Sequence, residues 1–108
     1  MTDIWPTALE CAAEIMRQAV PGMQVVVVPV QNIPAAACDG RWGANCGAVL
    51  AMPTPNAGTL VTKYPDNKRL MLHEAAHVVQ YSARRPWNTP AAERDAERVA
   101  ARWGECRW

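Results

Sequence analysis

The sequence predicts an α+β fold: an N-terminal helix, a small three-stranded mixed or antiparallel sheet, a helix that carries the candidate site, and a C-terminal helix that completes it. Three observations support this order. A helical apolar pattern opens the chain, short β-rich runs occupy its middle, and two helical patterns follow residue 65. Because 108 residues can bury one modest core, we expect a single domain over residues 1–108.

The first helix is expected over Thr2–Val20, where apolar residues recur at helical spacing. A Pro-Gly pair ends this pattern, because neither residue continues a helix well. The run Val25–Val30 is rich in β-branched residues and therefore predicts a buried strand. Pro29 cannot donate a hydrogen bond to a neighbouring strand, which places the end of this strand at an edge or a bulge.

Two further strands are expected at Gly47–Met52 and Thr59–Tyr64. The residues between them, Pro53–Gly58, include two prolines, an asparagine and a glycine, which are typical of turns. The two strands are therefore expected to form a hairpin with a longer loop.

Both histidines of the chain fall within His73–His77, whose sequence HEAAH has the HExxH pattern of a zinc peptidase helix. Residues four apart lie on the same helix face, so both imidazoles can reach one tetrahedral zinc ion. Glu74 lies beside them, where it can polarise a metal-bound water. Tyr81 and Gln80 share this polar face, whereas apolar residues fill the opposite arc, as expected of a helix packed on a core. The alternative is a solvated polar face, which would more naturally carry lysine and glutamate.

A catalytic zinc usually has a third protein ligand, and the segment Thr89–Trp103 predicts a second helix that can supply it. Thr89 suits the N-cap and is followed by proline at the first helical position. Glu93 and Glu97 border the apolar face of this helix, whereas Asp95 points with the arginines toward water. Glu93 can complete a His₂Glu site, and Glu97 can accept a hydrogen bond from the free ring nitrogen of a ligating histidine. The alternative is that Glu93 stabilises the helix N-terminus and Glu97 pairs with an arginine.

These segments resemble the gluzincin group of metallopeptidases, and within it the single-domain minigluzincins and the ImmA/IrrE-type peptidases. The resemblance lies in the C-terminal part of the chain and depends on Arg69–His77 and Glu93–Ala100. It implies three metal ligands, which are His73, His77 and Glu93. It also implies that Glu74 is the general base and that Glu97 orients a histidine.

In that family, the strand before the metal helix lies along the cleft and pairs with an extended substrate. In this sequence, the strand expected before the metal helix contains Thr59, Leu60, Val61 and Thr62. Their unpaired backbone groups would bind peptide by strand addition, with little demand on the peptide sequence. The alternative is that they form an interior strand.

The expected function is that of a zinc metalloendopeptidase made of one minimal zincin-like domain, with one Zn²⁺ per chain. Zinc would activate a water, Glu74 would act as general base, and a peptide or protein would be the substrate. Tyr81, one turn after His77, is the favoured oxyanion donor, with Arg84 as the alternative. The alternative function is a catalytically idle, zinc-stabilised module that binds a peptide or protein.

The cysteines and charges bear on location and partners. Cys38 and Cys46 bracket a loop, and Cys11 and Cys106 lie on the terminal helices, so two disulfides are conceivable. No basic start followed by an apolar run is present, so we expect no signal peptide and favour a cytoplasmic protein with reduced thiols over secretion by another route. The net charge of +1, without long basic or apolar runs, favours neither a nucleic-acid nor a membrane partner.

Overall fold

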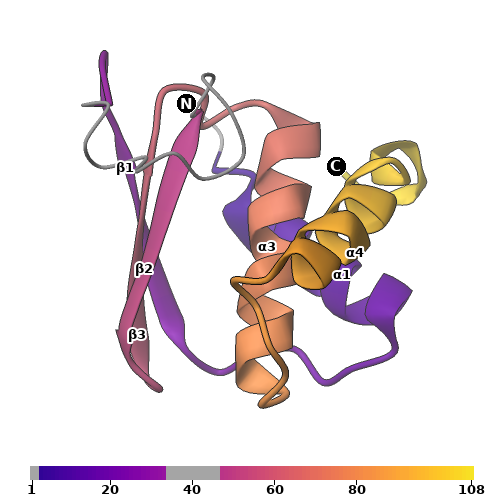
Figure 1. The fold of residues 1–108 in the computed structure, drawn as a ribbon. Coiled ribbons are helices and arrows are strands. Elements are labelled where there is room, and N and C mark those ends of the chain that lie inside the picture. Colours follow the sequence, from indigo (N-terminus) through magenta and orange to yellow (C-terminus); the bar gives the residue numbers. More distant parts are fainter. Residues whose placement is uncertain (1–2, 34–46) are drawn as a thin grey trace. The chain divides into compact units, whose positions relative to one another are not determined.

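The computed structural model describes residues 3–33 and 47–108 (Figure 1). Its elements in chain order are α1 (Trp5–Met16), β1 (Gln24–Pro29), β2 (Ala48–Thr54), β3 (Ala57–Thr62), α3 (Lys68–Ser82), α4 (Pro90–Ala100) and the 3₁₀ helix η1 (Trp103–Glu105). Within these described ranges, three α-helices and a three-stranded mixed sheet confirm the predicted α+β class. The chain divides into two compact units, a helical unit of Met1–Gly22 and Asp66–Trp108 and a sheet unit of Met23–Pro65. Over the same described ranges, no helix combines the length and the apolar character needed to cross a membrane.

The strands of the sheet unit are ordered β1-β3-β2, with β1 parallel and β2 antiparallel to β3. The central strand is therefore β3, in which Leu60 pairs with Val27 on one side and with Leu50 on the other. Leu60 and Thr62 are fully buried. Because side chains alternate across a strand, these two residues mark the buried face of β3.

Strand β1 is an edge strand, which corrects the expectation of a buried strand. Val26 and Val28 are 61% and 37% exposed, whereas Val25 and Val27 are partly buried. Four consecutive valines show no polar alternation, so their pattern does not reveal that one face of the strand is open. Pro29 ends this edge strand, as predicted.

Strands β2 and β3 form the predicted hairpin, but its loop is shorter than expected. The first strand continues through Thr54 and the second begins at Ala57, so Pro55 and Asn56 alone connect them. The hydroxyl oxygen of Thr54 accepts hydrogen bonds from the backbone N–H groups of Asn56 at 3.4 Å and of Ala57 at 3.1 Å. This side-chain turn closes the hairpin.

In the helical unit, α3 packs against both α1 and α4. A side-chain cap starts each of the two site helices: Asn67 Oδ1 accepts a hydrogen bond from Leu70 N at 2.9 Å, and Thr89 Oγ1 accepts one from Ala92 N at 3.1 Å. The cap at Thr89 and the following proline confirm the predicted start of α4. The buried apolar side chains of the three helices are Trp5, Ala8, Leu9, Cys11, Ala12, Ala13, Met71, Leu72, Ala75, Ala76, Val78, Val79, Ala92, Ala96, Val99 and Ala100.

An arginine in the left-handed conformation follows each of α1 and α3, with φ of 56° at Arg17 and 58° at Arg84. After α3, Arg84 N donates to Tyr81 O at 3.0 Å and Arg85 N donates to Gln80 O at 2.9 Å. These hydrogen bonds satisfy carbonyl groups of the last helical turn. The left-handed turn also ends α1 before the Pro-Gly pair that the sequence indicates.

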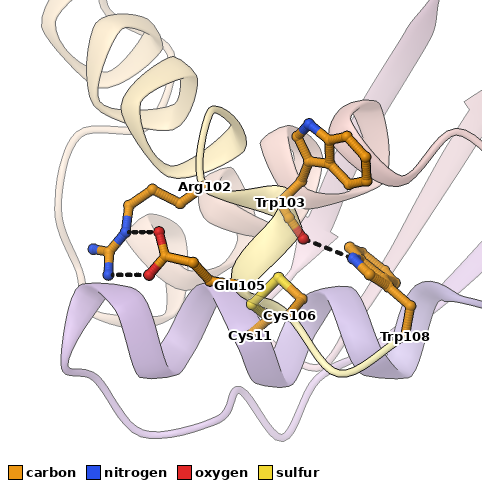
Figure 2. The surroundings of a disulfide bond; sticks show 6 residues. All are labelled: Cys11, Arg102, Trp103, Glu105, Cys106 and Trp108. Carbon is orange, nitrogen blue, oxygen red and sulfur yellow. Dashed lines mark hydrogen bonds and ion pairs between the residues drawn. A yellow bond between two sulfur atoms is a disulfide. The ribbon is translucent and has the colours of Figure 1, made fainter.

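A disulfide between Cys11 and Cys106 joins α1 to the segment that follows η1 (Figure 2). The two Cα atoms lie 5.6 Å apart, although 95 positions separate the residues in sequence. The expectation of reduced thiols is therefore wrong for this pair. Cys38 and Cys46 lie outside the described residues.

Two contacts hold the segment around η1. The guanidinium of Arg102 donates two hydrogen bonds to the Glu105 carboxylate, each of 2.8 Å, and these bonds lower the pKa of Glu105 (Figure 2). Trp108 Nε1 donates to the carbonyl oxygen of Trp103 at 2.7 Å. Both contacts are exposed, so the disulfide is the stronger constraint on this segment.

Candidate metal centre

Three potential metal-binding side chains converge within the helical unit. His73 Nε2 lies 2.7 Å from Glu93 Oε1, His77 Nε2 lies 2.9 Å from Glu93 Oε2, and the two Nε2 atoms lie 3.2 Å apart. Both histidines are buried, and the side chain of Glu93 is 20% exposed. The structure thus brings together the three residues predicted as metal ligands.

Helix geometry accounts for this convergence. His73 and His77 lie four residues apart on α3, so their rings occupy successive turns of one face. Glu93 lies in the first turn of α4, whose start is fixed by the cap at Thr89. Ala92 and Ala96 are buried and small, which permits a close approach of α4 to α3.

The donor set and its spacing fit zinc. Two imidazole nitrogens and one carboxylate are a ligand set of catalytic zinc sites. Ligand atoms about 2.0–2.1 Å from a tetrahedral zinc lie about 3.3–3.4 Å from one another. The two Nε2 atoms lie 3.2 Å apart, close to that spacing, and one ligand atom from each of the three residues lies within 4.8 Å of the others. His73, His77 and Glu93 can therefore hold one ion together.

The second ring nitrogen of His77, Nδ1, contacts Gln80, a residue for which the sequence predicts no role. His77 Nδ1 lies 2.9 Å from Gln80 Oε1. Gln80 is 2% exposed, and its Nε2 donates to the carbonyl oxygen of Ala92 at 3.0 Å. The signal that could have indicated Gln80 is its helical phase, because it shares the polar face of the two histidines.

The outer nitrogen of His73 faces Glu97, the residue predicted to orient a histidine. Glu97 Oε1 lies 2.6 Å from His73 Nδ1, and Glu97 Oε2 lies 3.4 Å from Arg69 Nη2. The first contact is close but lacks the alignment of a hydrogen bond, so the buried Nδ1 atom has no hydrogen-bond partner. The Glu97 side chain is 54% exposed, although its helical phase borders the apolar face.

Glu74 is half-buried on α3, next to His73 in sequence. Burial is the main cause that raises its pKa above the ordinary value of 4.5, and the negative charge of Glu93 raises it further. The charges of His73 and His77 act in the opposite direction. Glu74 thus lies within the electrostatic field of all three candidate ligands, as a nearby proton acceptor would.

Asp95 does not simply point to water, which corrects its predicted role. Its Oδ2 accepts a hydrogen bond from Gln80 Nε2 at 3.3 Å, and its Oδ1 accepts one from Arg98 Nη2 at 3.2 Å. The helical phase correctly places Asp95 with an arginine, but Gln80 is long enough to reach it from α3. Asp95 is therefore linked to His77 through Gln80.

The two candidate oxyanion donors lie at the end of α3. The ring of Tyr81 contacts Trp87 edge to face, with 6.1 Å between the centroids. Arg84 is exposed and follows the helix in the left-handed conformation. A role for either residue at the oxyanion stays a prediction.

The prediction that Thr59, Leu60, Val61 and Thr62 bind substrate assumed unpaired backbone groups, and this assumption is wrong. These residues belong to β3, which is paired with β1 on one side and β2 on the other. Their backbone groups point toward partner strands on both sides and are not available to add a peptide strand. The alternative of an interior strand is confirmed, and the sheet edges are β1 and β2.

Comparison of the chain with protein-family models, with curated proteins and with solved structures gave no match. The functional interpretation therefore depends on the residues and distances described above.

Proposed function

We propose that this protein is a zinc-dependent endopeptidase of gluzincin type, with one zinc per chain. The observation that carries the proposal is the convergence of two Nε2 atoms and one carboxylate within 3.2 Å of one another. Glu74 beside this cluster favours an enzyme over a structural site, because a structural zinc needs no proton acceptor.

Zinc bound by His73, His77 and Glu93 would supply Lewis acidity toward a carbonyl oxygen and toward water. Glu74 accepts a proton from the water that attacks the scissile carbonyl carbon, and it later delivers this proton to the leaving amine as the C–N bond breaks. Its raised pKa suits both steps, since a carboxyl shifted toward neutral pH can accept and return a proton.

The disulfide bears on where this reaction takes place. Disulfides persist in oxidising compartments and are rare in the cytosol. The bond between Cys11 and Cys106 therefore supports an oxidising compartment over a cytoplasmic location.

The test compares wild type with Glu74→Gln. Both proteins should bind one zinc per chain by metal analysis, because Glu74 is not a ligand. Wild type should cleave an unstructured protein, with fragments identified by mass spectrometry, and the variant should be slower by about 10²–10⁴-fold.

Three outcomes would contradict the proposal. A wild type that binds no zinc would remove the metal site, and equal cleavage by both proteins would remove Glu74 from the reaction. A fully metallated wild type that binds peptides from a broad library without cutting them would replace the enzyme by a zinc-stabilised binding module.

A further inference from the structure

We propose that Gln80 is a positioning residue that fixes the tautomer of His77 and couples the ring to the backbone that carries Glu93. This inference deepens the proposed function and relies on it for the identity of the metal. The observation that carries it is the chain of contacts from His77 through Gln80 to Ala92.

The orientation of the Gln80 amide follows from its partner on α4. The carbonyl oxygen of Ala92 lies 3.0 Å from the amide nitrogen of Gln80 and can only accept a hydrogen bond. Asp95 Oδ2, at 3.3 Å, is a second acceptor on the same side. The NH₂ group of Gln80 must therefore face α4, and its oxygen must face His77.

The tautomer of His77 follows from that orientation. Gln80 Oε1 has no proton to give, so His77 Nδ1 must carry the proton that joins the two atoms across 2.9 Å. In a neutral imidazole, Nε2 is then left with a free lone pair. Nε2 faces Glu93 Oε2 at 2.9 Å, and this carboxylate is a second acceptor that competes for the ring proton. Gln80 holds the proton on Nδ1 against this competitor, which gives the tautomer that a metal ligand requires.

Burial makes Gln80 a stronger positioning group than Glu97. Gln80 is 2% exposed, so little water can compete for the Nδ1 proton of His77. Glu97 is 54% exposed, and its contact with His73 lacks hydrogen-bond alignment. The ring of His77, held by Gln80, is thus better preorganised for metal binding than the ring of His73.

Gln80 also connects the two site helices. It lies on α3 with His77, whereas the carbonyl group that it binds belongs to Ala92, the residue before Glu93. One amide therefore fixes the ring of one ligand and the backbone next to another. Loss of this amide should loosen both positions together.

The experiment uses ¹⁵N NMR of the imidazoles in metal-free protein, at a pH where both rings are neutral. Wild type should show His77 with its proton on Nδ1. Gln80→Met has a similar length but no amide, and it should shift His77 to a mixture of tautomers. It should also weaken zinc binding by about 10–100-fold, the usual cost of losing a partner of a ligand, as measured by competition with a chelator. Gln18→Met, at an exposed position after α1, should change neither readout.

Gln80→Glu separates positioning from packing. A carboxylate oxygen can still accept the Nδ1 proton but cannot donate to Ala92 O or Asp95 Oδ2. This variant should therefore keep the wild-type tautomer and lose the link to α4, while Gln80→Met loses both. An Nε2 proton on His77 in the folded, metal-free wild type would overturn the proposal, and so would an unchanged tautomer and zinc affinity in Gln80→Met. The wild-type spectrum gives this answer even where a variant fails to fold. A wild type that binds no zinc would contradict the proposed function. The NMR measurement of the His77 tautomer would still test the role of Gln80.

Discussion

Arg69 Nη2 lies 3.4 Å from Glu97 Oε2, and this contact leaves the other oxygen of the same carboxylate facing His73 at 2.6 Å. Arg69 and Glu97 are each 54% exposed, so water competes with both contacts. An exposed ion pair of this kind contributes only about 0.2–1 kcal/mol. Glu97 should therefore act mainly through His73, with Arg69 as a minor support.

The first prediction concerns this exposed side of the site. Glu97→Ala should weaken zinc binding by about 10-fold, at the low end of the range for a partner of a ligand, because its contact with His73 is poorly aligned. Arg69→Ala should change zinc affinity by less than about fivefold, which corresponds to the strength of an exposed pair. Chelator competition measures both effects. A larger loss in Arg69→Ala than in Glu97→Ala would reverse the assigned order.

The second prediction concerns the third ligand. Glu93→Ala should lose more zinc affinity than the roughly 10–100-fold cost of removing an outer partner, because it removes a ligand atom. Asp95→Ala should have a milder effect, since Asp95 reaches His77 only through Gln80. Glu14→Ala, on the exposed face of α1, should have none. Zinc retained by the Glu93 variant and lost by the Asp95 variant would show that the third ligand is wrong.

The third prediction is a pH dependence of stability in metal-free protein. Burial raises the pKa of Glu74 above its ordinary value of 4.5, so the folded protein holds a proton that the unfolded chain has already released. The free energy of unfolding should therefore fall as the pH rises from 4.5 through the folded pKa. This loss is absent below pH 4.5 and complete above the folded pKa.

Glu74→Gln should remove this loss. In the presence of a chelator, urea unfolding at a series of pH values should show a variant that is more stable than wild type at neutral pH. The difference should disappear at acid pH, where Glu74 is protonated in both the folded and the unfolded state. Parallel stability curves for the two proteins would contradict the raised pKa.

The fourth prediction concerns the disulfide. Replacing Cys11 and Cys106 together by serine should lower the free energy of unfolding by about 4–5 kcal/mol, the chain-entropy value for a loop of this length. The zinc affinity of the folded variant should be unchanged, because His73, His77 and Glu93 are held by α3 and α4. Peptide mapping without reductant should recover the linked pair. Equal stability of the two proteins would mean that the bond does not constrain the chain.

The fifth prediction concerns the turn after α3. Arg84→Gly should raise the free energy of unfolding by up to about 1 kcal/mol, because glycine adopts φ of 58° without the cost of a side chain. Arg85→Gly, at the next position, should lower it, since Arg85 does not have a positive φ. Chemical denaturation checks both. Similar shifts in the two variants would show that the left-handed turn carries no strain.

The metal ligands could be predicted because their signals are local. The spacing of His73 and His77 specifies one helix face, and Thr89 with the following proline specifies where α4 begins. From that starting point, helical phase places Glu93 toward the other helix. Each of these inferences needs only a few neighbouring residues.

The parts that were missed depend on partners distant in sequence. The amino acids of β3 do not reveal whether the strand is central or at an edge of the sheet. Its position depends on pairing with β1, which is far away in the chain. The pairing of Cys11 with Cys106 is one of several connectivities that four cysteines allow. Gln80 shares the phase of the histidines, but its role appears only once Ala92 is placed beside it.

The turn between α3 and α4 contains two consecutive exposed arginines, Arg84 and Arg85. A tryptic cut between them would leave the two histidine ligands on one fragment and Glu93 on the other. The fragments would stay joined, because Cys11 lies before the cut and Cys106 lies after it. A nicked molecule would thus keep its complete ligand set as a two-chain protein, and a thiol reductant would be needed to release the halves.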